Sequence, residues 1–62
     1  LTQRELQVVR LLATDLSLQE IAASLVVAPA TLYTHTKNIY RKLDVHKRVE
    51  AVQRARELGL IP

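Results

Sequence analysis

The side chains best suited to chemistry lie in the stretch from Thr31 to Arg48, and their chemistry is binding rather than catalysis. Tyr33, Lys37 and Arg41 are spaced i, i+4 and i+8, so a helix would place them on one face. A phenol and two cations in such a row can donate hydrogen bonds and attract negative charge. The spacing therefore favours a surface that meets a polyanion, with an ordinary solvated helix face as the alternative.

The basic charge of the chain is concentrated in its second half. Residues 1–31 carry two basic and three acidic side chains, a net charge of 2 − 3 = −1, whereas residues 32–62 carry seven and three, a net charge of 7 − 3 = +4. Such an asymmetry indicates a polyanionic partner such as nucleic acid, although solvated faces can also be this basic. Five of the basic residues fall within twelve positions: Lys37, Arg41, Lys42, Lys47 and Arg48.

The sequence gives no support to catalysis or metal binding. It contains no cysteine, and its two histidines, His35 and His46, have no clustered carboxylates with which to complete a zinc site. No serine or threonine has a base at a suggestive spacing, and there is no phosphate-cradling glycine loop. We expect no enzyme activity, no metal and no other cofactor. We also expect His35 to be packed and hydrogen-bonded, and His46 to face solvent.

The length of 62 residues allows one domain with a thin aliphatic core. Hydrophobic residues make up 48% of the chain, but Phe and Trp are absent, and a chain of this size buries only about 60% of the surface that it exposes when unfolded. No apolar run approaches the roughly 18 residues of a membrane span, and no signal peptide is recognisable. We expect a soluble domain excised from a longer protein, because the patterned sequence already begins at Leu1.

Two capping boxes of the Ser/Thr-x-x-Glu type predict where the first two helices begin. Apolar residues at three- and four-residue spacing follow each box and predict helices over about residues 3–14 and 18–25. The second helix is expected to end before Pro29, whose ring suits the first position of a third helix. The two boxes are formed by Thr2 with Glu5 and by Ser17 with Glu20.

The second half of the chain predicts two further helices, over about residues 29–43 and 47–58. Gly59 is well placed as the left-handed C-cap of the last helix. The whole chain, residues 1–62, is therefore expected to be one all-α domain of four helices. The residues expected to face the core are Leu32, His35, Ile39 and Leu43 in the third helix and Val52, Ala55 and Leu58 in the fourth.

The second and third helices are joined by a turn of only three or four residues. A short helix followed across such a turn by a longer basic helix is the layout of a helix-turn-helix, for which a plain helical mini-bundle is the alternative. A helix that enters the major groove contacts bases near its N-terminal end and phosphates further along, and its first amides can bind a phosphate. With this placement, the residues that would contact bases are Tyr33, Thr34 and Lys37. Those that would contact phosphates are Thr31, Arg41 and Lys42.

These segments together resemble the LuxR-type helix-turn-helix domain, also called GerE or NarL-like, of bacterial transcription regulators. The similarity runs from Leu1 to Ile61 and includes, in order, LTQRE, SLQEIAASL, TLYTHTKNIYRKLDVHKR and AVQRARELGLI. The resemblance implies sequence-specific binding of double-stranded DNA by the C-terminal domain of a regulator in the bacterial cytoplasm, at the nucleoid. It also implies a homodimer through the fourth helix and RNA polymerase as a further partner. The RARELGLI ending is most similar to the MalT-like ATP-dependent regulators, although response regulators and autoinducer sensors share the domain.

The resemblance also implies roles for individual positions. The family's base-reading positions correspond to Tyr33, Thr34 and Lys37, and its phosphate-contacting positions to Thr31, Arg41 and Lys42. Arg48 is expected either to touch the DNA backbone or to brace the fold. The dimer face on the fourth helix is expected to comprise Val49, Gln53 and Arg56.

Three positions depart from the family pattern. Asp15 stands where a glycine is usual between the first two helices, which predicts a slightly different turn. Ala28 replaces the usual serine cap of the recognition helix and forfeits about 1 kcal/mol of stability, which Pro29 offsets in part. Tyr33 stands where a basic residue is frequent, which predicts a changed base preference.

Two other functions are compatible with parts of the pattern. A promoter-recognition region of a sigma factor shares the LTxRE start and the EIA helix, but it would not need the fourth helix with its AVQRARELGLI ending. A helical protein-interaction module could instead present the same basic face to an acidic partner. The salt dependence of duplex binding separates these alternatives, because a partner module would show neither a steep dependence nor a sequence preference.

Overall fold

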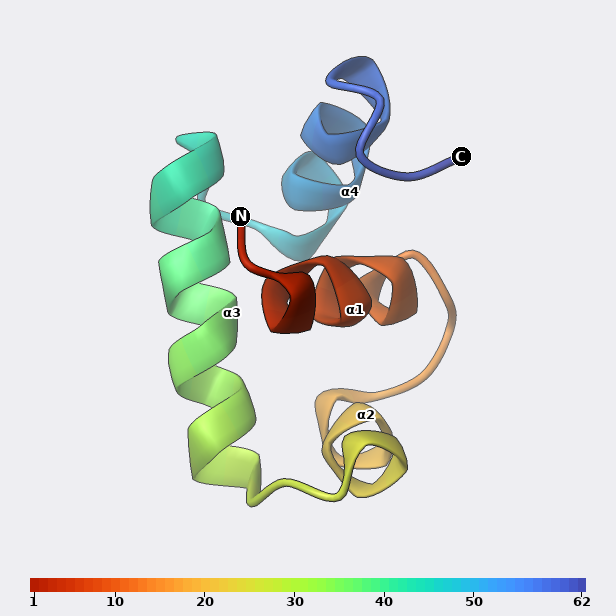
Figure 1. Ribbon diagram of the computed structural model, residues 1–62, viewed down its shortest axis with the longest axis vertical. Helices are drawn as coiled ribbons and strands as arrows, with labels where there is room; N and C mark the ends of the chain where they lie inside the picture. Colours follow the sequence, from red (N-terminus) through yellow and green to blue (C-terminus); the bar gives the residue numbers. More distant parts are fainter.

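The computed structural model describes all of residues 1–62 and consists of four α-helices without strands (Figure 1). The predicted all-α architecture is confirmed. Three boundaries differ from the prediction by one or two residues: α1 already ends at Leu12, and α4 is one residue shorter at each end than predicted. The helices are α1 (Gln3–Leu12), α2 (Leu18–Leu25), α3 (Pro29–Leu43) and α4 (Arg48–Glu57).

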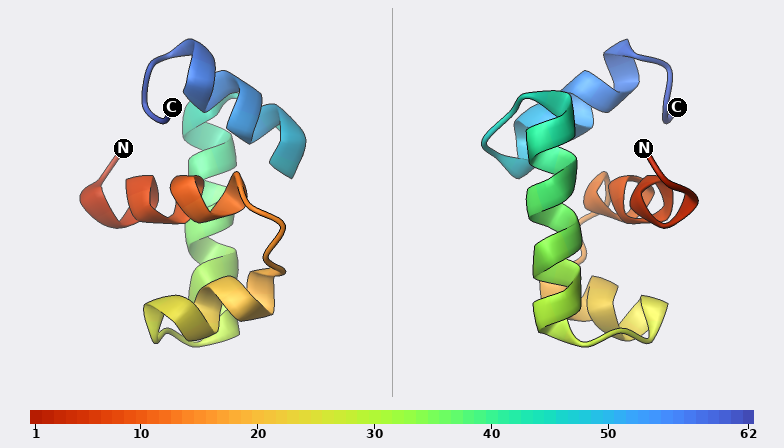
Figure 2. Two further views of the ribbon diagram at one scale, coloured as in Figure 1. Left: turned by 90° about the vertical axis from the view of Figure 1, so that its right-hand side faces the viewer. Right: turned by 60° about the vertical axis from the view of Figure 1, so that its left-hand side comes forward.

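The longest helix, α3, packs against all three other helices. Helix α1 crosses its middle, α2 packs near its N-terminal end, and α4 packs near its C-terminal end (Figures 1 and 2). The right-hand view of Figure 2 brings α3 in front of the other helices and shows that one long side of it is uncovered. Every helix is too short or too polar to traverse a lipid bilayer.

The core is aliphatic, as the composition predicts, and α3 contributes the expected inner face. Thr36 is also buried there and satisfies its hydroxyl by donating to the Leu32 carbonyl at 2.9 Å. The prediction for His35 was wrong in part, because its ring is only half-buried and makes no hydrogen bond in the structure. The buried apolar residues are Val8, Val9, Leu12, Ile21, Ala22, Leu32, Ile39, Leu43, Ala51, Ala55 and Ile61.

The C-terminal end of α4 explains one further correction. Leu58 was expected in the core, yet it is 51% exposed. Gly59 takes the predicted left-handed conformation (φ 73°) and reverses the chain, so that the Leu60 amide donates to the Ala55 carbonyl at 2.9 Å. Beyond this reversal Ile61 is buried in the core, whereas Leu58 is not.

The helix starts follow the sequence closely. Both capping boxes form, with the Thr2 and Ser17 hydroxyls accepting from the amides of Glu5 and Glu20. Ala28 is the N-cap of α3 and makes no side-chain capping hydrogen bond, as predicted. Asp15, in the connection between α1 and α2, does not adopt a positive φ, so aspartate causes no left-handed strain at this position.

The turn between α2 and α3 contains the most strained residue of the chain. Val26 lies in the left-handed region (φ 56°, ψ 48°) and is 90% exposed. It ends α2 by letting the Val27 amide donate to the Ala22 carbonyl at 3.0 Å. A left-handed conformation costs a residue with a Cβ about 1–2 kcal/mol, and a branched Cβ makes it less favourable still. Val26 therefore stores strain at the centre of the helix-turn-helix.

Replacing Val26 with Gly is expected to raise the free energy of unfolding by about 1 kcal/mol, because glycine relieves this strain and the exposed valine loses few contacts. Urea denaturation of the two chains measures the change. Ala23→Gly, an exposed position inside α2, is the matched control and should lose about 1 kcal/mol. A loss of stability in both variants would contradict the assignment of strain to Val26.

Candidate nucleic-acid interface

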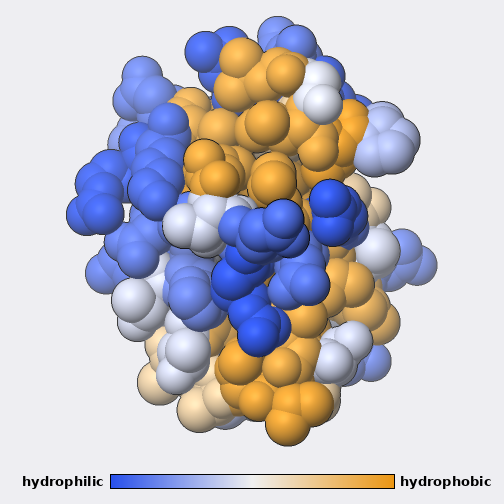
Figure 3. All heavy atoms as spheres, viewed as in Figure 1, coloured by the Kyte–Doolittle hydropathy of each residue, from blue (hydrophilic) through white to orange (hydrophobic).

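The uncovered side of α3 presents Tyr33, Thr34, Lys37 and Arg41 together to solvent, opposite the buried residues of the same helix. The helical periodicity brings this about, because residues four apart lie one turn above each other. Figure 3 shows strongly hydrophilic side chains along the upper part of the edge that α3 forms, and near-neutral ones toward its N-terminal end below. The structure thus assembles the predicted base-contacting residues and one phosphate-contacting residue on one accessible surface.

The N-terminal half of this surface offers hydrogen-bonding groups. Thr31 is exposed in the first turn of α3, where the first amides of a helix have no partner within the helix. The Thr34 hydroxyl already donates to the Ala30 carbonyl at 3.2 Å, which leaves its lone pairs to accept from a ligand. This end of α3 can therefore hold an anion or present polar atoms to a base edge.

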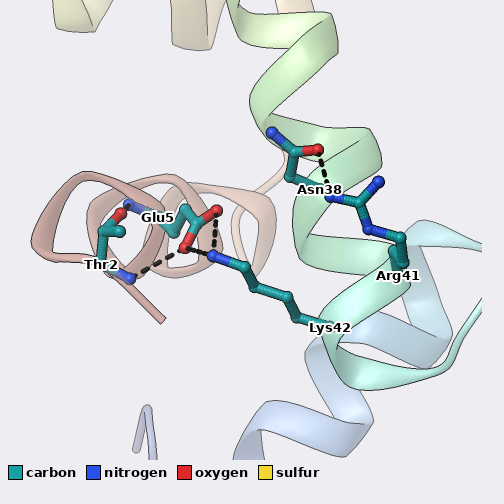
Figure 4. Close-up of polar contacts among 5 residues, drawn as sticks. All are labelled: Thr2, Glu5, Asn38, Arg41 and Lys42. Atoms are coloured by element: carbon teal, nitrogen blue, oxygen red, sulfur yellow. Dashed lines mark hydrogen bonds and ion pairs between the residues drawn. The ribbon is translucent and has the colours of Figure 1, made fainter.

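Two contacts along α3 orient its exposed cations. The ammonium of Lys37 lies over the ring of Tyr33, with Nζ 5.3 Å from the ring centroid. The guanidinium of Arg41 donates to Oδ1 of Asn38 at 3.0 Å (Figure 4). The sequence prediction did not include either contact, although the i, i+4 and i, i+3 spacings could have suggested both.

Lys42 turns away from the exposed face and forms the single ion pair of the structure. Its ammonium donates to both carboxylate oxygens of Glu5 in α1, at 2.9 and 3.1 Å (Figure 4). Glu5 is only 4% exposed and also accepts from the Thr2 amide at 2.8 Å. The hydrogen bond from Lys42, followed by the one from Thr2, lowers the pKa of Glu5. A predicted phosphate contact thus already has a carboxylate partner within the protein.

Arg48 braces the fold, which is one of its two expected roles. Its guanidinium donates to the carbonyls of Leu12, Thr14 and Leu16, at 2.9, 2.8 and 2.7 Å. These bonds fix the connection between α1 and α2 against the start of α4. Burial raises the pKa of the neighbouring Tyr40 phenol, which the charge of Arg48 opposes.

The predicted dimer residues lie together on α4. Val49, Gln53 and Arg56 line a shallow hollow that α4 forms with the end of α1, and Val49 is 72% exposed. Arg56 also donates to the Pro62 carbonyl at 3.1 Å, so it is partly engaged with the chain end. Hydrophobic and polar residues contribute equally to the lining of the hollow.

Comparison with known proteins identifies the domain. Residues 1–55 match the family described as "Bacterial regulatory proteins, luxR family", or GerE. The chain belongs to this family. The resemblance noted in the sequence is thereby confirmed, and the match favours the luxR family over the sigma-factor alternative. This luxR-family domain is a DNA-binding helix-turn-helix of bacterial transcription regulation, and its family is one of regulators rather than enzymes.

Two relatives show how the luxR-family domain recurs in larger proteins. The HTH-type transcriptional regulator MalT of Serratia proteamaculans (strain 568) is 50% identical over 58 residues, which are 94% of this chain and 6% of that protein. The crystal structure of the response regulator ChrA in a heme-sensing two-component system matches with a TM-score of 0.96 and 39% identity, covering 98% of this chain and 30% of that chain. The chain thus spans a small part of either relative, and two of the three regulator groups considered from the sequence are represented.

Proposed function

We propose that this chain binds double-stranded DNA with sequence preference, as the DNA-binding part of a bacterial transcription regulator, and that α3 lies in the major groove. The observation that carries this proposal is the uncovered face of α3, which presents Tyr33, Lys37 and Arg41 on successive turns. The short turn from α2 supports the docking, because a short helix joined in this way to a longer basic helix is the layout of a helix-turn-helix.

The proposal divides the residues of α3 by their distance from its N-terminus. Tyr33, Thr34 and Lys37 face base edges, and Thr31 and Arg41 hold phosphates. Lys42 and Arg48 stabilise the packing of the helices and do not contact DNA, because their cationic groups already bind Glu5 and backbone carbonyls.

We further propose that two copies bind two half-sites and meet through the α4 surface formed by Val49, Gln53 and Arg56. The exposed valine beside the hollow supports this contact, since an apolar side chain at the surface gains from burial against a second copy. DNA as the ligand places the protein at the nucleoid in the bacterial cytoplasm, with RNA polymerase as a further partner. Sedimentation of the chain on duplexes with one and two half-sites tests the dimer.

Replacing Arg41 with Ala is expected to weaken binding to all duplexes alike and to lower the slope of log K against log salt by about 1. The physical reason is the loss of one phosphate contact, because Arg41 is an exposed cation beyond the base-contacting positions. Titration of a preferred and an unrelated duplex at several salt concentrations measures the slope.

Arg54→Ala is the matched control, because it removes the same charge from an exposed position on α4. It should leave the slope nearly unchanged. Equal slopes for the Arg41 variant and the original chain would remove Arg41 from the phosphate contacts. If the original chain itself showed no salt slope and no sequence preference, the function would instead be that of a protein-interaction module.

A further inference from the structure

Lys37 has one interaction partner in the structure, the aromatic ring of Tyr33. The distance from Nζ to the ring centroid, 5.3 Å, is within the range in which a cation is attracted to the face of an aromatic ring. The only ion pair of the chain joins other residues, and no hydrogen bond engages the Lys37 ammonium. Both side chains are exposed, so neither is held by core packing. The position of this cation therefore depends on the ring.

Arg41, one turn further along α3, also displaces the Lys37 ammonium toward the Tyr33 ring. Arg41 lies four residues toward the C-terminus, and its guanidinium is held on α3 by Asn38 at 3.0 Å. Two like charges one turn apart repel each other. Repulsion from Arg41 and attraction to Tyr33 both displace the Lys37 ammonium toward the N-terminal end of α3, the direction in which helical side chains already lean.

The Tyr33 side chain offers two groups that could affect base choice, its hydroxyl and its ring. The hydroxyl has no hydrogen-bond partner in the structure, whereas the ring has the Lys37 ammonium. A ring that holds a cation acts on the DNA through that cation. The observed contact therefore points to a role for the ring.

We propose that Tyr33 is a positioning residue, whose ring holds the Lys37 ammonium at the base-contacting end of α3, and that Lys37 makes the selective contact. An ammonium donates and cannot accept, and guanine presents two acceptors in the major groove, so the base selected through this pair is guanine. The inference rests on the proposed function, because it names the base-selecting group of the same surface.

Nuclear magnetic resonance of the free chain tests the positioning without DNA. Ring currents should shift the ε-methylene protons of Lys37 in the original chain and in Tyr33→Phe, which keeps the ring. The shift should disappear in Tyr33→Leu. A Lys37 signal that is the same in Tyr33→Leu as in the original chain would overturn the positioning role, whatever the chain binds.

Duplex titrations test the consequence for base choice. A randomised-duplex selection with the original chain first identifies the preferred site and its guanine. We expect Tyr33→Phe to leave discrimination at this base pair nearly unchanged, and Tyr33→Leu to reduce it about two- to fivefold, the range of an exposed cation–π contact. In a Lys37→Met background, Tyr33→Leu should change the discrimination no further. Thermal unfolding of each variant checks that the fold is retained, as expected for a residue that is 58% exposed.

Three results would distinguish a failure of the positioning role of Tyr33 from a failure of the proposed DNA-binding function. If Tyr33→Phe alters base preference as much as Tyr33→Leu, the hydroxyl reads the base and the positioning role is overturned. If Tyr33→Leu has the same effect with and without Lys37, the two residues act independently and the inference is again wrong. If the original chain binds duplexes without any sequence preference, the proposed function itself fails.

Discussion

Replacing Arg48 with Ala is expected to lower the free energy of unfolding by about 3 kcal/mol, the largest effect of any single substitution considered. The guanidinium donates to three carbonyls, those of Leu12, Thr14 and Leu16. Hydrogen bonds to charged groups contribute about 1.5–3 kcal/mol each when buried, and the partial exposure of this site reduces their sum. Since a domain of this size is only marginally stable, a large fraction of the variant should be unfolded at 37 °C.

Urea denaturation followed by circular dichroism measures this loss. Arg54→Ala on the same helix removes the same charge where no hydrogen bond is made, and it should stay within about 0.5 kcal/mol of the original chain. The free energy of unfolding of Arg48→Lys should lie between those of the two alanine variants, because an ammonium cannot reproduce the planar set of donors of a guanidinium. If the Arg48 and Arg54 alanine variants were equally stable, the carbonyl contacts would contribute nothing to the fold.

Replacing Glu5 with Gln is expected to lower the free energy of unfolding at pH 7 by about 2 kcal/mol, the second largest effect. Glutamine can still serve in a capping box, so the substitution isolates the charge that binds Lys42. Removing one partner of a fully buried ion pair costs about 3–5 kcal/mol, and the smaller figure here reflects the 44% exposure of the Lys42 side chain.

The same pair makes stability depend on pH in a defined direction. The pKa of Glu5 is lowered in the folded chain from 4.5, its ordinary value, by the Lys42 and Thr2 hydrogen bonds. A lowered pKa contributes stability that is complete above the unfolded pKa and is lost as the pH falls through the folded pKa. The original chain should therefore lose more stability than Glu5→Gln on acidification from pH 6 to about pH 3.

Glu20→Gln is the matched control for both measurements, because Glu20 occupies the same place in a capping box but has no cationic partner. Its hydrogen bonds to the Ser17 amide and hydroxyl also lower its pKa, so some pH dependence is common to both glutamates. The difference between the two glutamine variants reports the ion pair. Identical curves for the two variants would show that Lys42 adds nothing to the capping box.

The helix boundaries and the uncovered face of α3 were predictable because local chemistry determines them. The capping boxes and Pro29 predict where the first three helices start, and the position of Gly59 predicts the final turn. Periodicity then separates the buried side of α3 from its exposed side. Leu58 was misplaced because periodicity was extended to the last turn, where the chain reverses.

The partners that Lys42 and Arg48 find far away in the sequence were not predictable. Arg48 reaches carbonyls 32 to 36 positions earlier in the chain, and Lys42 reaches a carboxylate 37 positions earlier. A sequence pattern shows which side of a helix is polar but not which group on another helix it meets. Contacts between helices thus distinguish the cations that support the scaffold from those that face outward.

This distinction limits how strongly one copy can hold a polyanion. Of the five basic residues between positions 37 and 48, Lys42 and Arg48 are bound internally, which leaves 5 − 2 = 3: Lys37, Arg41 and Lys47. Each neutralised phosphate releases about 0.9 counterion. Since one copy has only three such cations in this stretch, counterion release adds little to its affinity for DNA. Tethering two copies raises their effective concentration at neighbouring half-sites. Avidity, rather than the charge of one domain, would then determine how long the regulator stays on its operator.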